Sequence, residues 1–341
     1  MKFKGVLTLI LVFVAALYTG ADTFNKYIEY KFPTDEVNAV APNTAVSSPF
    51  VTLPLELTPT TNSNSENSSA VTTANPKAAI GKITDRVISP YGANTSYNNV
   101  YLKNNTGAKI NLASLLKQPL DFKITKNEKP QVLIVHTHAT ESYMDEQRDY
   151  YVAEDKTRTT DKTKNMVMIG EIFASKLKAA GIGVVHDKTL HDSPSYTGSY
   201  TRSAETVEKH LKENPSIKVI IDIHRDAITS SDKTKSRPVV NINGKRAAQV
   251  MLVMGSQTGD IKNFPNWQKN LSLAVKYQQT LEVMYPSLAR AITLNSAKYN
   301  QNLSIGSILL EVGSEANTFD EAKNAAEAAA TALVSLLNTQ S

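Results

Sequence analysis

The chain of 341 residues contains no cysteine. This absence excludes a disulfide, a thiolate nucleophile and a Cys-ligated zinc site, and it leaves His, Asp and Glu as the metal ligands and acid–base groups. No internal repeat of the repeat-module type is found either. The formal net charge of +5 suits work beside anionic material such as a cell wall or membrane surface, although an excess this small is also common in soluble proteins. We predict no nucleic-acid partner.

One apolar run stands near the N-terminus, after two lysines. Residues 5–18 are uncharged and mostly apolar, and the uncharged segment continues to Ala21. Its length of about 17 residues, roughly 25 Å as a helix, lies between a signal-peptide core and a full membrane span. We predict a retained membrane anchor over residues 1–21, and cleavage after the small residues 19–21 is the alternative. In both cases the rest of the chain is expected outside the cytoplasm.

The next segment, residues 22–82, is polar and low in complexity. Its centre, residues 59–69, reads PTTNSNSENSS. Such a composition buries too little apolar surface to offset the entropy of ordering, so we predict a disordered linker. As a random coil it would let a folded domain range on the order of 40 Å from the membrane.

The remainder alternates between strand-like and helix-like segments. We predict a small lead-in segment over residues 83–128 and the main, catalytic domain over residues 129–341. Strands are expected at 131–136, 182–185, 217–223, 249–254 and 305–311, and helices at 165–180, 203–213, 265–285 and 319–337. This order is typical of an α/β fold with a mainly parallel twisted sheet flanked by helices. Thr318 and Glu321 are spaced as a capping box for the last helix.

Two of the expected strands end in residue types that bind metals. One apolar run is followed by His136-Thr-His138-Ala-Thr-Glu141, and another by Asp222-Ile-His224. Open α/β sheets hold their sites at the carboxyl ends of strands, so these side chains are expected at one edge of the sheet. His136 and His138 alternate with Thr137, which predicts that both point to the same face of an extended strand.

A turn after His138 would bring Glu141 onto the same ion. With His224 as the third ligand, the set is two His and one Glu, a known catalytic zinc set that leaves a fourth position for water. Zinc in such a site lowers the pKa of that water and polarises a carbonyl. His136 is the alternative to His138 as a ligand, and Asp222 is expected to orient a ligand histidine.

Glu311 is the candidate acid–base residue. It stands directly after an apolar run, where a carboxylate is expensive to bury without a partner. Hydrolysis needs a base for the water and an acid for the leaving amine, and Glu311 suits both roles. The remaining histidines, His186, His191 and His210, are expected to be solvated.

Several segments together resemble the stage II sporulation protein P family. They are HTHATESY (136–143), YTRS (200–203), NPSIKVIIDIHRDA (214–227), QVMLVMG (249–255) and LLEVGSEANT (309–318). The resemblance runs from about Val100 to the C-terminus, and the anchor and linker agree with the family's layout. It implies a zinc-dependent N-acetylmuramoyl-L-alanine amidase fold that cleaves the amide between the lactyl group of muramic acid and the stem peptide of peptidoglycan. An endopeptidase action on stem cross-links is also attributed to the family.

The resemblance further implies a role in engulfment of the forespore, together with the sporulation proteins D, a lytic transglycosylase, and M. The protein would be membrane-anchored at the septal or engulfing membrane of a sporulating cell, with its catalytic domain extracytoplasmic. The family's pattern puts zinc on a histidine of the 136–138 motif and on His224, with Glu311 as the catalytic residue. Related wall amidases take a glutamate ligand from the start of the first helix, where this chain has Asp161 and no Glu. We therefore assign Glu141, with Asp161 as the alternative.

Two other functions fit the same residues. A zinc carboxypeptidase-like peptidase would also use His-x-x-Glu, a distant His and a later Glu, and it would release single C-terminal residues. A non-catalytic wall-binding scaffold of a sporulation complex would keep its biological function after Glu311→Gln.

Overall fold

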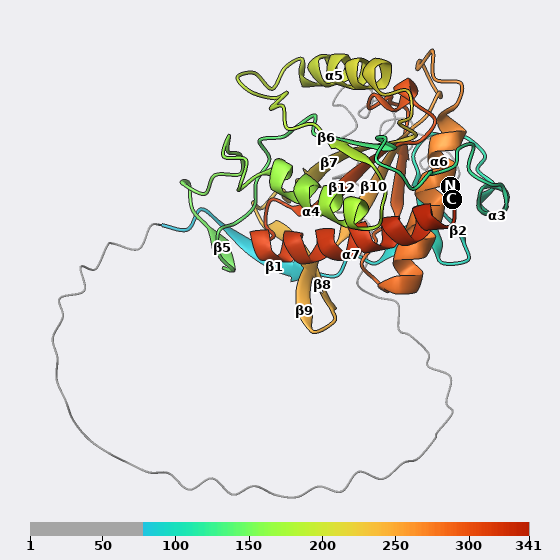
Figure 1. Ribbon diagram of the computed structural model, residues 1–341. Coiled ribbons are helices and arrows are strands. Elements are labelled where there is room, and N and C mark those ends of the chain that lie inside the picture. Colours follow the sequence, from blue (N-terminus) through green and yellow to red (C-terminus); the bar gives the residue numbers. More distant parts are fainter. Residues whose placement is uncertain (1–77, 341) are drawn as a thin grey trace, which may run out of the picture. The chain divides into compact units, whose positions relative to one another are not determined.

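The structure is a computed structural model that describes residues 78–340 (Figure 1). The predicted anchor at 1–21 and nearly all of the predicted linker at 22–82 lie outside these residues. Within 78–340, no helix has both the length and the apolar character that crossing a membrane requires.

Eight strands form the main sheet: β2 (Thr95–Tyr97), β3 (Val100–Asn104), β4 (Val132–Val135), β6 (Val184–His186), β7 (Val219–Asp226), β10 (Val250–Gly255), β11 (Ile292–Asn295) and β12 (Ser307–Ser314). Their order is β2-β3-β11-β10-β12-β7-β4-β6. Neighbours run parallel, except that β2–β3 and β10–β12 are antiparallel. The predicted α/β class is confirmed as a mixed α/β fold in which most strand pairs are parallel.

A second sheet was not predicted. Its strands are β1 (Gly81–Arg86), β5 (Tyr150–Tyr151), β8 (Lys235–Ile242) and β9 (Lys245–Ala248), in the order β5-β1-β8-β9. The residues of β8 do not read as a strand because Arg237 is charged and yet buried. Its Nη1 lies 3.0 Å from Asp85 Oδ1, so an ion pair with a neighbouring strand compensates the burial.

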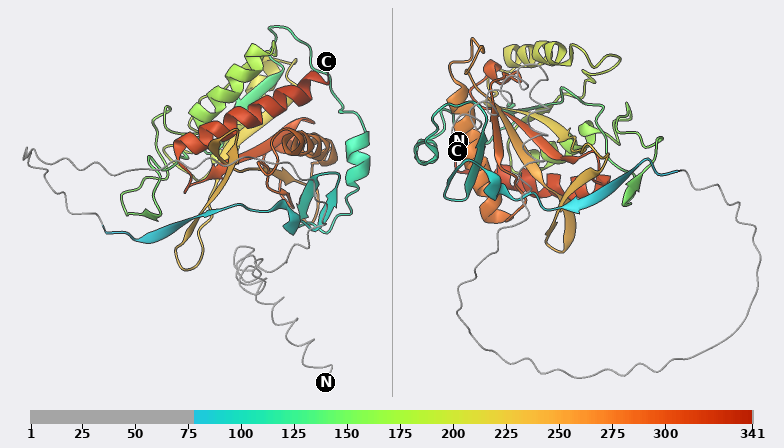
Figure 2. Two further views of the ribbon diagram at one scale, coloured as in Figure 1. Left: turned by 90° about the horizontal axis from the view of Figure 1, so that it is seen from below. Right: turned by 180° about the vertical axis from the view of Figure 1, so that it is seen from behind.

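Four helices cover the main sheet: α4 (Met166–Ala179), α5 (Ser199–Glu213), α6 (Trp267–Met284) and α7 (Phe319–Asn338). The first, third and fourth pack in one core with Val132 and Ile134 of β4, whereas α5 packs with Leu133 and Val135 on the other face (Figures 1 and 2). Alternate residues of β4 thus enter two different cores. The capping box of α7 is present, since Thr318 and Glu321 bond each other's backbone N–H groups.

Shorter elements complete the described part of the chain: the helix α3 (Leu112–Lys117) and the 3₁₀ helices η1 (Pro90–Gly92) and η2 (Gln301–Leu303). The segment 83–128, predicted as a lead-in, supplies β2 and β3 to the edge of the main sheet and most of β1 to the second sheet.

The two faces of the main sheet are covered unequally along its width. All four residues of β4 are buried. In β3 and β11 burial alternates: Leu102 and Ile292, which face α6, are fully buried, whereas Lys103 is exposed and Thr293 is partly exposed. Helix α5 therefore covers one half of its face, and the half formed by β10, β11 and β3 stays more open.

Candidate metal centre

The end of β4 is fixed to β7 through one threonine. The backbone N–H of Thr137 donates to Asp222 Oδ1 over 2.8 Å, and the Thr137 hydroxyl donates to Asp222 Oδ2 over 2.6 Å. The chain then turns, and the N–H of Glu141 donates to the carbonyl oxygen of His138 over 3.2 Å. The turn that the sequence predicts after His138 is therefore present.

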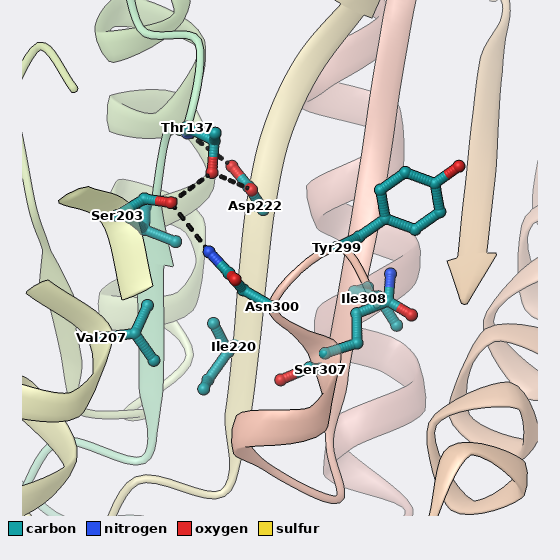
Figure 3. Close-up of a pocket in the computed structure, with 11 residues that line it drawn as sticks. Thr137, Ser203, Val207, Ile220, Asp222, Tyr299, Asn300, Ser307 and Ile308 are labelled. Carbon is teal, nitrogen blue, oxygen red and sulfur yellow. Dashed lines mark hydrogen bonds between the residues drawn. The ribbon is translucent and has the colours of Figure 1, made fainter. Parts of the chain in front are cut away.

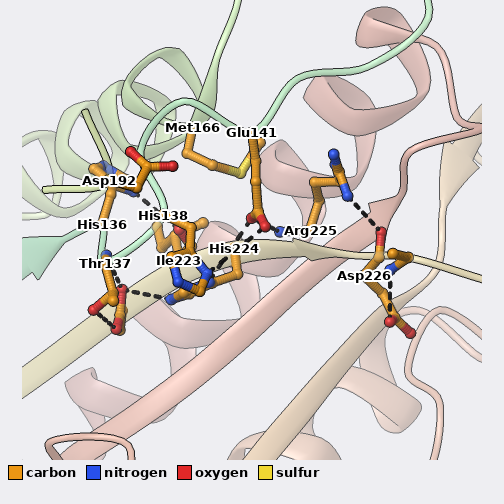
Figure 4. Close-up of polar contacts among 12 residues, drawn as sticks. His136, Thr137, His138, Glu141, Met166, Asp192, Ile223, His224, Arg225 and Asp226 are labelled. Atoms are coloured by element: carbon orange, nitrogen blue, oxygen red, sulfur yellow. Dashed lines mark hydrogen bonds and ion pairs between the residues drawn. The ribbon is translucent and has the colours of Figure 1, made fainter. Parts of the chain in front are cut away.

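This turn and β7 bring His138, Glu141 and His224 together (Figure 4). Each is buried, and one ligand atom from each lies within 4.8 Å of the others. Nδ1 of His138 and Nδ1 of His224 each lie 3.8 Å from an oxygen of Glu141. Tetrahedral zinc sites place neighbouring ligand atoms roughly 3.3 Å apart, so a small closure would complete such a site. Two imidazoles and a carboxylate also match the donor chemistry of zinc.

The far nitrogens of the two imidazoles have partners of their own. Nε2 of His138 lies 3.1 Å from the hydroxyl of Ser199, the first residue of α5. Nε2 of His224 forms an ion pair with Asp222 Oδ1 over 2.8 Å, without the geometry of a hydrogen bond, and Asp222 is the residue predicted to orient a ligand histidine. Contacts of this kind fix the ring orientation of a ligand histidine. They leave both Nδ1 atoms directed at Glu141.

The charges around the cluster favour a cation. Burial, with His224 nearby, lowers the pKa of His138 to about 4, so this ring is neutral near pH 7. Burial also acts to lower the pKa of His224, but the carboxylates of Asp222 and Glu141 raise it to about 10. The carboxylates around His224 therefore stabilise a positive charge at this ring. A divalent metal ion bound at Nδ1 would provide that positive charge in place of the proton.

His136 points away from the cluster, to the face of the sheet that α4 covers. Its Nδ1 lies 3.0 Å from the carbonyl oxygen of Ile223, and its Nε2 lies 2.9 Å from Nε2 of His186. The prediction that His136 and His138 share a face is wrong. The strand ends one residue before His136, and the turn that follows redirects His138, so the alternation of an extended strand no longer applies.

Two of the three histidines predicted to be solvated are buried. His191 is 2% exposed and places Nδ1 2.8 Å from the carbonyl oxygen of His136. The His186 side chain is 3% exposed and lies between His136 and Glu171, whose Oε2 is 3.2 Å from its Nδ1. Gly170 of α4 leaves room for these rings, because a Cβ there would lie 2.6 Å from Nε2 of both His136 and His186. The prediction of solvation is wrong for His186 and His191.

Asp161, the alternative to Glu141 as a ligand, lies on the surface outside the cluster. Its carboxylate accepts hydrogen bonds from the hydroxyl and the backbone N–H of Thr163, which lower its pKa. These local bonds occupy Asp161 in a turn before α4, and the structure favours Glu141.

Glu311 lies on β12, between β7 and β10. It is directly opposite His224 in the parallel register of β7 and β12. Its Oε2 is buried and has no hydrogen-bond partner among residues 78–340. Burial raises the pKa of Glu311 to about 8; His224 and Arg290 oppose this shift, and Asp226 and Glu141 add to it. A carboxyl group with a pKa near neutrality suits general acid–base catalysis.

Two residues of the centre were missed from the sequence. The ring of Tyr196 stacks on His138, with centroids 4.5 Å apart and planes 25° apart, and Arg158 lies 5.0 Å from the Tyr196 ring. Arg158 also donates to Asp192 over 2.6 Å and to Glu141 over 3.2 Å. Both residues lie in loops, where no periodic pattern marks them.

A hydrogen-bonded chain connects the centre to α5 through the wall of a small cavity (Figure 3). The Thr137 hydroxyl lies 2.8 Å from the hydroxyl of Ser203. The side-chain amide of Asn300 donates to Ser203 Oγ over 3.0 Å and to the carbonyl oxygen of Tyr200 over 2.8 Å. Asn300 has a left-handed backbone with φ of 56°. These bonds hold the first turn of α5, and with it Ser199, against the strand ends.

Residues 36–334 match the family model of the Stage II sporulation protein P (SpoIIP). The chain belongs to this family. Stage II sporulation protein P of Bacillus subtilis (strain 168) is 30% identical over 265 residues, which cover 70% of this chain and 63% of that protein. The match thus spans less than two thirds of this relative. The family predicted from the sequence is confirmed.

Solved structures with some similarity include the N-acetylmuramoyl-L-alanine amidase AmiC2 of Nostoc punctiforme, at 14% identity and a TM-score of 0.37 over 62% of this chain and 97% of that chain. An N-acetylmuramoyl-L-alanine amidase from Clostridium difficile 630 gives 17% identity and a TM-score of 0.36 over 63% and 100% of the two chains.

Proposed function

We propose that this SpoIIP protein is a peptidoglycan hydrolase of sporulation, a zinc-dependent N-acetylmuramoyl-L-alanine amidase. The observation that carries the proposal is the position of Glu311, opposite His224 in the register of β7 and β12 and beside the buried cluster of His138, Glu141 and His224. A carboxyl group next to two imidazoles and a carboxylate is the arrangement that metal-assisted amide hydrolysis needs. Membership of a sporulation family supports the biological setting.

His138, Glu141 and His224 would hold zinc, which polarises a carbonyl and lowers the pKa of water. Glu311 serves both halves of the reaction. As a carboxylate it takes a proton from the attacking water, and as an acid it gives that proton to the leaving nitrogen of L-alanine. The bond broken joins the lactyl carbonyl carbon to this nitrogen, and the new C–O bond leaves a free lactyl carboxylate. A pKa of about 8 keeps both forms of Glu311 populated near neutral pH.

We also propose the wider setting that the sequence predicts. The apolar run at residues 5–18 supports an N-terminal membrane anchor with the catalytic domain extracytoplasmic, at the septal or engulfing membrane. Endopeptidase action on stem cross-links and cooperation with the sporulation proteins D and M in forespore engulfment belong to the same proposal. They rest on the family resemblance alone.

The test is product mapping on purified peptidoglycan. We expect mass spectrometry to find stem peptides with a free N-terminal L-alanine, a chelator to stop their release, and added zinc to restore it. Glu311→Gln should retain zinc, measured by elemental analysis, and should lose about 10²-fold or more of the rate. Glu213→Gln, an exposed glutamate of α5, is the matched control.

Other products would point elsewhere. Single C-terminal residues would indicate a carboxypeptidase. Release of stem peptides that is indifferent both to the chelator and to Glu311→Gln would show that the proposed centre is not the active site.

A further inference from the structure

The open half of the main sheet begins beside Glu311. Met251 on β10 is directly opposite Glu311 on β12, so both side chains project from the same face. The hydroxyl of Thr293 on β11 donates to Met251 Sδ over 3.5 Å. Thr293 is paired in turn with Lys103 on β3. These four residues form an oblique row across four neighbouring strands, from the candidate catalytic acid to an exposed lysine. The row is oblique because Thr293 is in register with Val253 of β10, two residues after Met251.

Beyond Glu311, the row is accessible to solvent. Lys103 is exposed, Met251 and Thr293 are partly exposed, and their strand neighbours Leu252 and Ile292 point into the core under α6. Three steps between strands, of about 4.8 Å each, and the offset of two residues along the strands make the row roughly 16 Å long. An extended peptide rises about 3.3–3.6 Å per residue, so about four residues would fit along it.

The chemistry of the proposed reaction indicates in which direction the stem peptide extends along this row. The leaving nitrogen receives its proton from Glu311, so the peptide that begins at this nitrogen starts beside Glu311. On one side of Glu311 lies His224 with the ligand cluster, on the part of the sheet that α5 covers. On the other side lies Met251 and the open face. The departing peptide therefore has its free path across β10, β11 and β3.

We propose that the row of Met251, Thr293 and Lys103 binds the stem peptide of the substrate in an extended conformation, with its C-terminal carboxylate at Lys103. Met251 offers apolar contact, Thr293 a hydroxyl group, and Lys103 the positive charge that a peptide carboxylate pairs with. The proposal rests on the amidase function and adds to it a specificity for the length of the peptide.

The test compares two soluble substrates with the purified full chain: a muramoyl tetrapeptide and a muramoyl group that carries L-alanine alone. Lys103→Glu should raise KM for the tetrapeptide substrate about tenfold and leave KM for the short substrate unchanged. Lys103→Arg, which keeps the charge, should behave as the parent. Lys178→Glu makes the same charge change on the exposed side of α4, beyond the opposite face of the sheet, and should change neither KM.

Binding of the free tetrapeptide, measured by calorimetry, separates this inference from the amidase function. We expect Lys103→Glu to weaken it about tenfold. The parent protein could cleave neither substrate and still bind the free tetrapeptide more tightly than Lys103→Glu does. The amidase function would then be wrong, and the proposed peptide-binding row would be supported. If Lys103→Glu leaves peptide binding unchanged, or changes KM equally for both substrates, the row does not bind the stem peptide.

Discussion

Arg158 donates a hydrogen bond from Nη2 to Oε1 of Glu141 over 3.2 Å. Its guanidinium also lies 5.0 Å from the ring of Tyr196, which stacks on His138. One cation thus contacts one candidate ligand directly and a second through an aromatic ring. Residues that orient metal ligands typically change metal affinity by about 10- to 100-fold when they are replaced.

We therefore predict that Arg158→Gln lowers zinc affinity by about 10- to 100-fold, because Glu141 loses the donor that fixes its carboxylate. Competition with a chelator of known affinity measures this. Arg86→Gln, an exposed arginine of β1, should bind zinc like the parent. If the Arg158 and Arg86 variants bind zinc with equal affinity, Arg158 does not help to orient the candidate ligands.

Gly170 should not tolerate a methyl group. Glycine in the middle of a helix normally costs about 0.5–1 kcal/mol relative to alanine, so Gly170→Ala would ordinarily stabilise α4. Here the Cβ would meet Nε2 of His136 and of His186 at 2.6 Å. We expect overpacking to dominate, with a net loss of about 1–3 kcal/mol in the free energy of unfolding.

Denaturant unfolding measures the effect of Gly170→Ala. In Gly92→Ala the new Cβ has no heavy atom within 4 Å, so its stability should stay close to that of the parent. A Gly170→Ala variant as stable as the parent would mean that the paired imidazoles are free to move apart.

Asn300 provides a test of the hydrogen bonds that hold α5. Glycine adopts the left-handed backbone of Asn300 without strain, so Asn300→Gly removes the side-chain bonds to Tyr200 and Ser203. The added backbone freedom of glycine is shared by the control variant below. We expect faster amide hydrogen exchange over residues 199–203 and weaker zinc binding, because Ser199 then holds His138 less firmly. Asn243→Gly, at φ of 52° between β8 and β9, should leave both measurements unchanged.

We predict that Glu282, which lies outside the candidate metal centre, makes the stability of the fold depend on pH. Burial raises the pKa of Glu282, and its Oε1 has no hydrogen-bond partner among residues 78–340. A raised pKa in the folded state means that ionisation destabilises the fold, so the penalty is present at pH 7 and vanishes below the ordinary pKa of about 4.3. Glu282→Gln should therefore raise Tm at pH 7 and leave it unchanged near pH 3.5. The exposed Glu213→Gln should show no such difference, and an equal gain at both pH values would rule out ionisation as the cause.

The periodic spacing of apolar residues made much of the fold predictable. The apolar run 132–135 reads as a strand buried on both faces, and α4 and α7 show clear helical patterns with caps. The antiparallel direction of β10 was not predictable, because the alternation of a strand is the same in either direction. Strand β8 was missed because Arg237 is buried through a partner that only the folded chain brings near.

The candidate ligands were predictable because strand ends in one sheet meet at one edge. The face of His138 was not, since β4 ends at Val135 and the turn that follows redirects His138 away from the face that Val132, Ile134 and His136 share. Arg158, Tyr196 and Asn300 act through contacts between segments that are distant in sequence, and residue types alone do not reveal such contacts.

Strand β12 is made late in the chain and yet lies in the middle of the main sheet, between β7 and β10. His138, Glu141 and His224 have all left the ribosome before Glu311 is synthesised. A growing chain therefore contains its candidate ligands first, and the candidate acid–base residue joins them only when β12 inserts between two strands already made. A chain that ends before Ser307 would thus carry all three candidate ligands and lack both Glu311 and the central strand of the main sheet.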